Sequence, residues 1–350
     1  MNLNKKLLAA VILVAMIVPL FSFTAFAKKD PTKNVQVVTS MGDSASSGFG
    51  LPDYNRHKKQ ILYGERIKDS YPDLVTRKLG AKKLNPLGIS GIRTYDLRFL
   101  LDNNFAADYI LRDVMGYMSE GVITEKRLKQ LRPKYQNAVK ESDVILLDVG
   151  FDDMWIPTIA CVYDIAEDGR FDKTSPQKTV QQKVREMGAV RTIIDTAIHY
   201  LIGFAGNPHK WVYYWAKWDI TCLKWATDYF RNYDAIIKEI YKLNPDVTLV
   251  SVGCYNPTSY WSILPGDRSL EHALQPYYDI INSEKQKWEQ IYDNYYYVEL
   301  RDIPMINNRA TIPLLENLTL DDSGFNPHPT LKGHRMIANA IMTELRKAAK

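Results

Sequence analysis

The stretch "NVQVVTSMG", residues 34 to 42, runs directly into "DSASSGFG", residues 43 to 50. The first part is apolar and β-branched, as is typical of a strand, and it ends on a glycine. The second part is small and polar and places Ser44 two residues past Gly42. Such a turn either only reverses the chain or holds a nucleophile at the carboxyl end of a strand.

Four further runs of the same kind follow along the chain. Each is short, β-branched or aromatic, and most end at glycine or another turn-forming residue. Their apolar residues are nearly continuous, which indicates strands that are covered on both faces. The runs are "KKLNPLG" (82–88), "DVILLDVG" (143–150), "DVTLVSVG" (246–253) and "YYYVELRD" (295–302).

Helical patterns separate these runs. Apolar residues recur at three- and four-residue steps over residues 180–201, 229–240 and 336–345. Strands that alternate with helices predict an α/β fold, with an open parallel sheet and helices on both of its faces. Two connections, at about 99–142 and 154–222, are longer than a crossover requires and predict insertions.

The first 27 residues have the pattern of a secretory signal peptide. Lys5 and Lys6 precede the apolar run "LLAAVILVAMIVPLFSF", and "AFA" at 25–27 offers small residues at the cleavage site. We expect cleavage after Ala27, export of the protein, and one domain over residues 28–350. An uncleaved membrane anchor is the alternative.

Charge and cysteine content exclude several kinds of partner and cofactor. The formal net charge is +5, and acidic and basic residues are interspersed along the chain. The sequence therefore lacks the cluster of basic residues that is typical of proteins that bind nucleic acid. Cys161, Cys222 and Cys254 are too few for a disulfide scaffold and lack the spacing of a metal site. A buried thiol is expected at the strand end that holds Cys254, so Cys161–Cys222 is the candidate disulfide. No metal or organic cofactor is predicted.

Polar and glycine-rich residues follow several predicted strands. Ser44 follows the first strand, Gly91 lies in the turn after the second, and His328 comes after the fifth, ahead of the last helix. Ligands of doubly wound sheets bind beyond the carboxyl ends of the strands. A serine hydroxyl needs a base such as histidine, and backbone N–H groups at glycine turns can stabilise an oxyanion. The three residues could therefore carry out acyl transfer.

Four blocks of the chain resemble the SGNH (GDSL) hydrolase family, in particular its larger secreted lipase-type members. They are "MGDSASSG", "NPLGISGIRTYDL", "LLDVGFDDM" and "HPTLKGHRMIANAI", in the family's order. The resemblance implies an α/β protein, a flavodoxin-like α/β/α sandwich with a five-stranded parallel sheet and helical insertions. It also implies ester hydrolysis with Ser44 as nucleophile, His328 as base, and Gly91 and Asp152 at the oxyanion-hole positions.

The first departure from the family pattern is Asp152, which stands where the family has an asparagine. An ionised carboxylate has no proton to donate and would repel an oxyanion. A carboxyl in a desolvated site can instead stay protonated and donate. We expect the protonated form because Val149, Phe151 and Trp155 nearby are apolar.

The second departure concerns the group that orients the histidine. The family usually places an aspartate three residues before it, but that position holds Phe325. Asp322, six residues before His328, is the first candidate for this role. A backbone carbonyl near Asn326 is the other.

The sequence predicts a secreted serine esterase or lipase that acts as a monomer on a small-molecule, lipid or glycan ester. Lipid or acyl esters are preferred, and transient contact with a membrane or the cell envelope is possible. The stretch "HKWVYYWAKWDITCLKW" (209–225) is interpreted as a lid or acyl pocket, a carbohydrate-stacking platform, or a packed inserted helix. Alternative functions are a carbohydrate O-acetyl esterase, an acyltransferase, and a catalytically silent binding protein.

Overall fold

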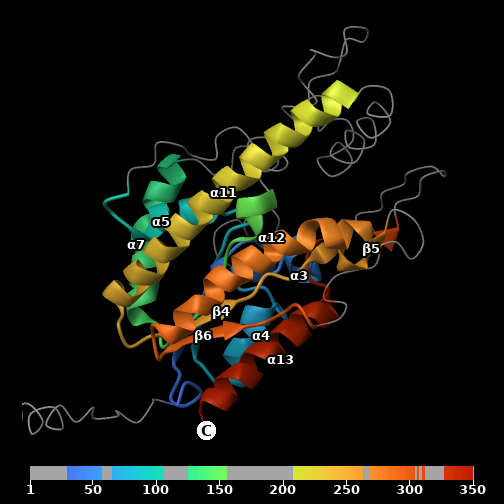
Figure 1. Ribbon diagram of the computed structural model, residues 1–350. Helices are drawn as coiled ribbons and strands as arrows, with labels where there is room; N and C mark the ends of the chain where they lie inside the picture. Colours follow the sequence, from blue (N-terminus) through green and yellow to red (C-terminus); the bar gives the residue numbers. More distant parts are fainter. Residues whose placement is uncertain are drawn as a thin grey trace, which may run out of the picture.

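The computed structural model describes residues 30–56, 65–105, 125–155, 208–262, 268–303, 306, 310–311 and 327–349. Within them, five parallel strands form one sheet in the order β2-β1-β3-β4-β6 (Figure 1). Flavodoxin-like doubly wound sheets have this strand order, so the predicted fold class is confirmed. Each strand lies within one of the predicted runs: β1 (Val37–Gly42), β2 (Lys83–Gly88), β3 (Val144–Asp148), β4 (Thr248–Val252) and β6 (Tyr295–Val298).

The register of the strands brings three carboxyl ends to one edge of the sheet. Gly42 at the end of β1 lies opposite Gly88 of β2 and opposite Asp148 of β3. The Asp43 N–H donates to the Asp148 carbonyl at 3.0 Å, and the Ile89 N–H donates to the Gly42 carbonyl at 2.8 Å. The turns that leave these strands therefore begin side by side.

Two helices, α4 (Tyr71–Lys78) and α13 (Leu331–Ala348), cover one face of the sheet (Figure 1). Helix α13 buries Ile337, Ile341 and Leu345, which recur at three- and four-residue steps as the sequence predicted. Its first turn is capped by Thr330, whose side chain accepts a hydrogen bond from the Gly333 N–H at 3.0 Å. Such a cap satisfies a backbone donor that the helix itself leaves unpaired.

Four helices cover the opposite face: α5 (Thr94–Leu101), α7 (Glu125–Glu141), α11 (Pro208–Leu243) and α12 (Ser269–Gln286). The first predicted insertion, at about 99–142, contains α7 and the end of α5, which contact one another. Helix α11 begins inside the second predicted insertion and continues unbroken to Leu243. The aromatic stretch 209–225 and the helix predicted over 229–240 are therefore one helix.

Burial along α11 differs between its two ends. Trp225, Tyr229 and Tyr233 are buried in the core, whereas Ile220 and Leu223, nearer the start, are 67% and 70% exposed. The end of the aromatic stretch thus packs as an inserted helix, which was one of its three interpretations. The side chains of Trp211, Trp215 and Trp218 lie outside the described part of the chain.

Tyrosine side chains fill much of the core, and several of their hydroxyl groups are hydrogen-bonded there. Tyr229 donates to the Ile281 carbonyl at 3.2 Å, and Tyr295 donates to the Lys285 carbonyl at 2.7 Å. The hydroxyl of Tyr233 lies 2.9 Å from that of Tyr295. A buried hydroxyl left without a partner costs about 1–3 kcal/mol, so these bonds allow large polar rings to pack inside.

Several short elements complete the described chain. Strands β5 (Trp261–Ser262) and β7 (Ala310–Thr311) form a separate two-stranded parallel pair. The sequence did not predict them, because two residues show no periodicity. The other short elements are α2 (Ser44–Ser47), α3 (Pro52–Arg56), η3 (Pro257–Tyr260) and η4 (Lys287–Gln290).

Some predictions fall beyond the described residues. The signal peptide over 1–27 and Cys161 lie outside them, as does the side chain of Cys222, so the candidate disulfide stays a prediction. Cys254 is buried and free, as its place at a strand end indicated. A search of the described helices finds none long and apolar enough to cross a membrane.

Candidate active site

Ser44 lies in the turn that leaves β1. Asp43 caps the four-residue helix α2 and accepts a hydrogen bond from the Ala45 N–H at 2.9 Å. Gly48 ends the helix in the left-handed conformation with φ 76°, which favours glycine. Ser44 begins α2 and is 8% exposed. The turn therefore holds the serine hydroxyl in a defined place at the edge of the sheet.

His328 reaches this serine from the far end of the chain. Its Nε2 lies 2.8 Å from the Ser44 Oγ, although 284 positions separate the two residues. The Phe49 and His328 ring centroids are 4.2 Å apart, so an aromatic ring covers the imidazole. Burial lowers the pKa of His328 to about 4. The imidazole is therefore neutral above about pH 5 and can accept the serine proton.

Gly91 and Asp152 meet at the same edge of the sheet. Gly91 has φ 83° in the turn after β2, and its backbone N–H faces the carboxyl group of Asp152, which follows β3. Asp152 is buried, and its Oδ2 has no hydrogen-bond partner among the described residues. Burial, helped by the neighbouring Asp153, raises the pKa of Asp152 to about 8. A raised pKa of this size favours the protonated carboxyl group at neutral pH.

Asp153, which the sequence analysis missed, links the turn after β3 to α5. Both of its carboxyl oxygens accept from Thr94, one from the backbone N–H at 2.9 Å and the other from Oγ1 at 2.5 Å. Burial raises the pKa of Asp153 to about 7. Its place beside Asp152 in the third block was the only signal in the sequence.

Two buried carboxyl groups and a buried lysine lie near Ser44. Asp148 accepts a hydrogen bond from the Tyr71 hydroxyl at 2.9 Å. Asp43 uses one carboxyl oxygen to cap α2, and its Oδ2 has no partner in the described chain. Burial raises the pKa of both carboxyls, and the charge of the fully buried Lys285 opposes that rise. Asp43 therefore stabilises the turn that holds Ser44.

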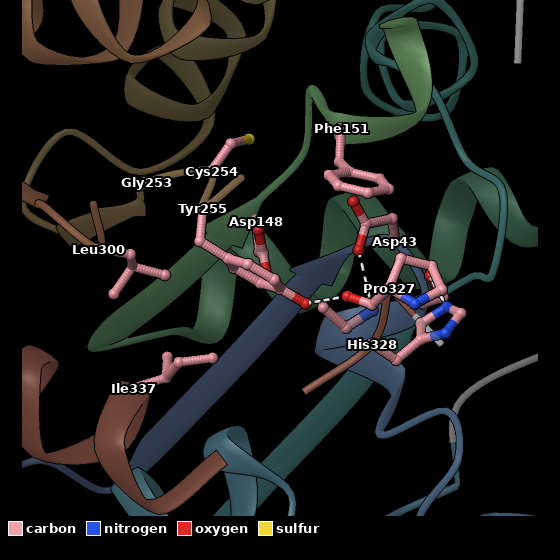
Figure 2. A pocket seen from close by; sticks show the side chains of 12 residues that line it. Asp43, Asp148, Phe151, Gly253, Cys254, Tyr255, Leu300, Pro327, His328 and Ile337 are labelled. Carbon is pink, nitrogen blue, oxygen red and sulfur yellow. Dashed lines mark hydrogen bonds between the residues drawn. The ribbon is translucent and has the colours of Figure 1, made fainter. Parts of the chain in front are cut away.

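A small cavity lies beside the serine–histidine pair (Figure 2). Its volume is ≈ 20 Å³, and Ser44, His328, Asp43, Asp148 and Tyr255 contribute to its wall. A cavity of this size holds about one water-sized group.

Partly buried aromatic rings surround the pair. Phe151 lines the same cavity, and its ring stacks on that of Trp155 at a centroid distance of 5.7 Å. The Trp155 indole N–H donates to the Tyr278 hydroxyl at 2.9 Å. With Phe49 over the histidine, aromatic side chains from two distant segments face the site. Sequence analysis named Phe151 and Trp155 only as apolar neighbours and missed Phe49.

Asp322 and Asn326 lie outside the described residues, so the group that orients His328 stays a prediction. His334 is fully buried, and its Nδ1 accepts a hydrogen bond from the Tyr71 N–H at 3.2 Å, so it packs inside the fold. Across the described ranges, no three histidine, cysteine or acidic side chains are grouped to hold a metal ion.

No protein-family model matches the chain, and no curated protein matches it. Among solved structures, it is similar to an extracellular lipase from Streptomyces rimosus, with 14% identity, a TM-score of 0.45, and coverage of 90% of this chain and 100% of the other. It is similar to phospholipase A1 from Streptomyces albidoflavus NA297, with 14% identity, a TM-score of 0.46, and coverage of 89% and 99%. A GDSL-like lipase from Parabacteroides merdae has 14% identity, a TM-score of 0.43, and coverage of 91% and 97%.

These TM-scores describe only a partial match of the backbones, so the chemistry of this chain rests on its own residues. Its four sequence blocks occur in the family's order. Three of them span the carboxyl ends of the neighbouring strands β2, β1 and β3 of the sheet. The strand order, together with Ser44 and His328 in contact at the carboxyl ends of the strands, confirms that the chain resembles the SGNH (GDSL) hydrolases.

Proposed function

We propose that the protein is a serine ester hydrolase that works through an acyl-enzyme. The observation that carries this proposal is the 2.8 Å contact between Ser44 Oγ and His328 Nε2. The lowered pKa of His328, about 4, leaves the imidazole neutral at neutral pH, so its Nε2 can accept the serine proton.

In the proposed reaction, Ser44 Oγ attacks the ester carbonyl carbon as His328 Nε2 takes the hydroxyl proton. The tetrahedral intermediate collapses, and the leaving alkoxide takes that proton from His328. A water molecule then attacks the acyl-serine by the same route, which releases the acid and restores Ser44. The Ser44 and Gly91 N–H groups and the protonated Asp152 are the proposed donors to the oxyanion.

For the substrate, we propose a lipid or acyl ester. The apolar rings of Phe49, Phe151 and Trp155 near the serine–histidine pair support this choice. The second candidate is a carbohydrate O-acetyl esterase. The small volume of the cavity, ≈ 20 Å³, favours it, because an acetyl group needs much less room than a fatty acyl chain. The same aromatic rings could then stack on a sugar.

We also propose that the protein is exported. The support is the basic, apolar and small-residue pattern of residues 1–27. Mass spectrometry of the protein from the culture medium would show an N-terminus at Lys28 if the signal is cleaved after Ala27. A cell-bound protein that retains its first 27 residues would contradict export by cleavage.

Hydrolysis of p-nitrophenyl acetate, butyrate, octanoate and palmitate tests the activity. Ser44→Ala should lose at least about 10⁴-fold in kcat, because it removes the nucleophile. Ser47→Ala is the matched control in the same turn, where the Ser47 hydroxyl donates to the Ser44 carbonyl at 2.9 Å and lies 3.5 Å from the Ser90 hydroxyl. A maximum at long chains supports a lipase, and activity on acetate alone supports deacetylation. Equal rates for wild type and Ser44→Ala on every ester would contradict the esterase proposal and favour a catalytically silent binding protein.

A further inference from the structure

Tyr255 connects the end of β4 to the segment that carries the histidine. Its hydroxyl donates a hydrogen bond to the backbone carbonyl of Pro327, the residue directly before His328 (Figure 2). Tyr255 lies three residues past the end of β4 and lines the same cavity as the serine–histidine pair. It therefore joins a strand end of the sheet to the catalytic segment.

The backbone that leads to Tyr255 is itself firmly held. The side-chain amide of Asn282, on α12, makes two hydrogen bonds to the Cys254 backbone. Its Oδ1 accepts from the Cys254 N–H at 2.8 Å, and its Nδ2 donates to the Cys254 carbonyl at 2.8 Å. The buried Lys285 on the same helix donates to the Val252 carbonyl at 2.6 Å. Helix α12 thus fixes the strand end from which the tyrosine projects.

The histidine segment is also held on its other side. The Thr330 N–H donates to the Ile306 carbonyl at 2.9 Å, and Thr330 then caps α13. His328 lies between Pro327 and Pro329, which have no N–H and cannot make backbone donor contacts. The carbonyl of Pro327 is therefore a point at which the sheet can hold the segment before the histidine.

We propose that Tyr255 is a positioning residue that keeps His328 against Ser44 by holding the Pro327 carbonyl. This inference rests on the proposed function and adds to it a part of the sheet that does not touch the ester. Small displacements of a catalytic base matter, because about 1 Å can cost about 10²-fold in rate. Burial raises the pKa of the Tyr255 hydroxyl well above its usual value, so it remains a donor at every pH of interest.

Tyr255→Phe tests the proposal, because it keeps the ring and removes only the hydroxyl. Tyr229→Phe is the matched control, since its buried hydroxyl also donates to a backbone carbonyl, that of Ile281. We expect a loss of about 10- to 100-fold in kcat for Tyr255→Phe, with KM within about twofold of wild type and a melting temperature like that of the control. Equal kcat for the two variants would overturn the proposal.

The pKa of His328, followed by NMR of the imidazole protons, gives a readout that does not depend on turnover. A released histidine meets water, so Tyr255→Phe should raise this pKa from about 4 toward the ordinary 6.5, and Tyr229→Phe should not. If Tyr255→Phe does not fold, Asn282→Ala takes its place with the same expected shift, and no shift overturns the proposal. The two proposals can fail separately. If wild type hydrolyses esters no faster than Ser44→Ala, but Tyr255→Phe still raises the pKa of His328, the esterase proposal is rejected and the positioning role of Tyr255 stands.

Discussion

Two adjacent aspartates in one turn are held differently by their surroundings. Both are buried, but Thr94 donates to both carboxyl oxygens of Asp153, whereas Asp152 faces the Gly91 N–H and has an Oδ2 without a partner in the described chain. Hydrogen bonds to the ionised form lower a carboxyl pKa. Burial is the largest cause of the raised pKa in both groups, which reaches about 8 for Asp152 and about 7 for Asp153, and the Thr94 hydrogen bonds oppose the rise at Asp153. Asp152 is the carboxyl group of the two that keeps an oxygen without a partner among the described residues.

Substitution Asp152→Asn should change the pH dependence of hydrolysis. In wild type, kcat/KM should rise near pH 4 as His328 loses its proton and fall near pH 8 as Asp152 ionises. Asparagine keeps a donor at every pH, so the variant should lose the alkaline fall, which in wild type approaches about 10²-fold. The measurement is kcat/KM on p-nitrophenyl acetate across the pH range. A wild-type rate that rises steadily from about pH 5 to 9, with Asp152→Asn slower at low pH, would contradict the protonated form.

Strands β1 and β3 approach so closely at their carboxyl ends that the last residue of β1 has no room for a side chain. A Cβ on Gly42 would lie 1.9 Å from the Asp148 carbonyl oxygen, a backbone atom that also accepts the Asp43 N–H. Strand β3 cannot move away from this side chain without disturbing its pairing with β1, which sets the position of Ser44. The small residue before the Asp-Ser pair is therefore a requirement of strand packing.

Gly42→Ala should destabilise the fold by about 3 kcal/mol or more, because the new methyl group overlaps backbone that cannot move. Urea unfolding followed by circular dichroism measures the change. Gly80→Ala is the control, since Gly80 has φ 67° but no atom within 4 Å of the place that a Cβ would take. The control should lose only about 1–2 kcal/mol from its backbone conformation. Equal losses for the two variants would show that the contact between β1 and β3 is not limiting.

At the scale of the whole molecule, burial of ionisable groups couples the fold to pH. Asp152 and Asp153 keep their protons to pKa values of about 8 and 7, against 3.8 when exposed. Their contribution to stability is present at low pH and is lost as the pH rises through 7 to 8, because unfolding then releases protons. His328 and His334 have lowered pKa values of about 4 and 3, so their contribution is present above 6.5 and is lost as the pH falls.

The melting temperature should therefore fall between about pH 7 and 8.5, where histidines exposed by unfolding, with their ordinary pKa of 6.5, are mostly neutral and the aspartate contribution dominates the change. Asp152→Asn should flatten this fall, because asparagine does not ionise. Differential scanning calorimetry at constant ionic strength measures both curves. Parallel curves for wild type and variant would mean that Asp152 is already ionised in the folded protein at pH 6.5.

The sequence predicted the elements well where local pattern decides them. All five sheet strands lie within the predicted apolar runs, because strands covered on both faces need continuous apolar residues. Ser44 and His328 were recognised because the residues beside them follow a family pattern. The unbroken α11 and the pair β5–β7 were not predicted, since a helix through an expected insertion and two-residue strands leave no local signal.

The sequence by itself determined the α/β class, the strands and the identity of the serine and the histidine, because each depends on residues close together in the chain. Only the tertiary structure decided that Ser44 and His328 are in contact across 284 positions, that Tyr255 contacts Pro327, and that burial raises the pKa of Asp152. Contacts and pKa values depend on which distant segments bury a group, and folding alone brings those segments together.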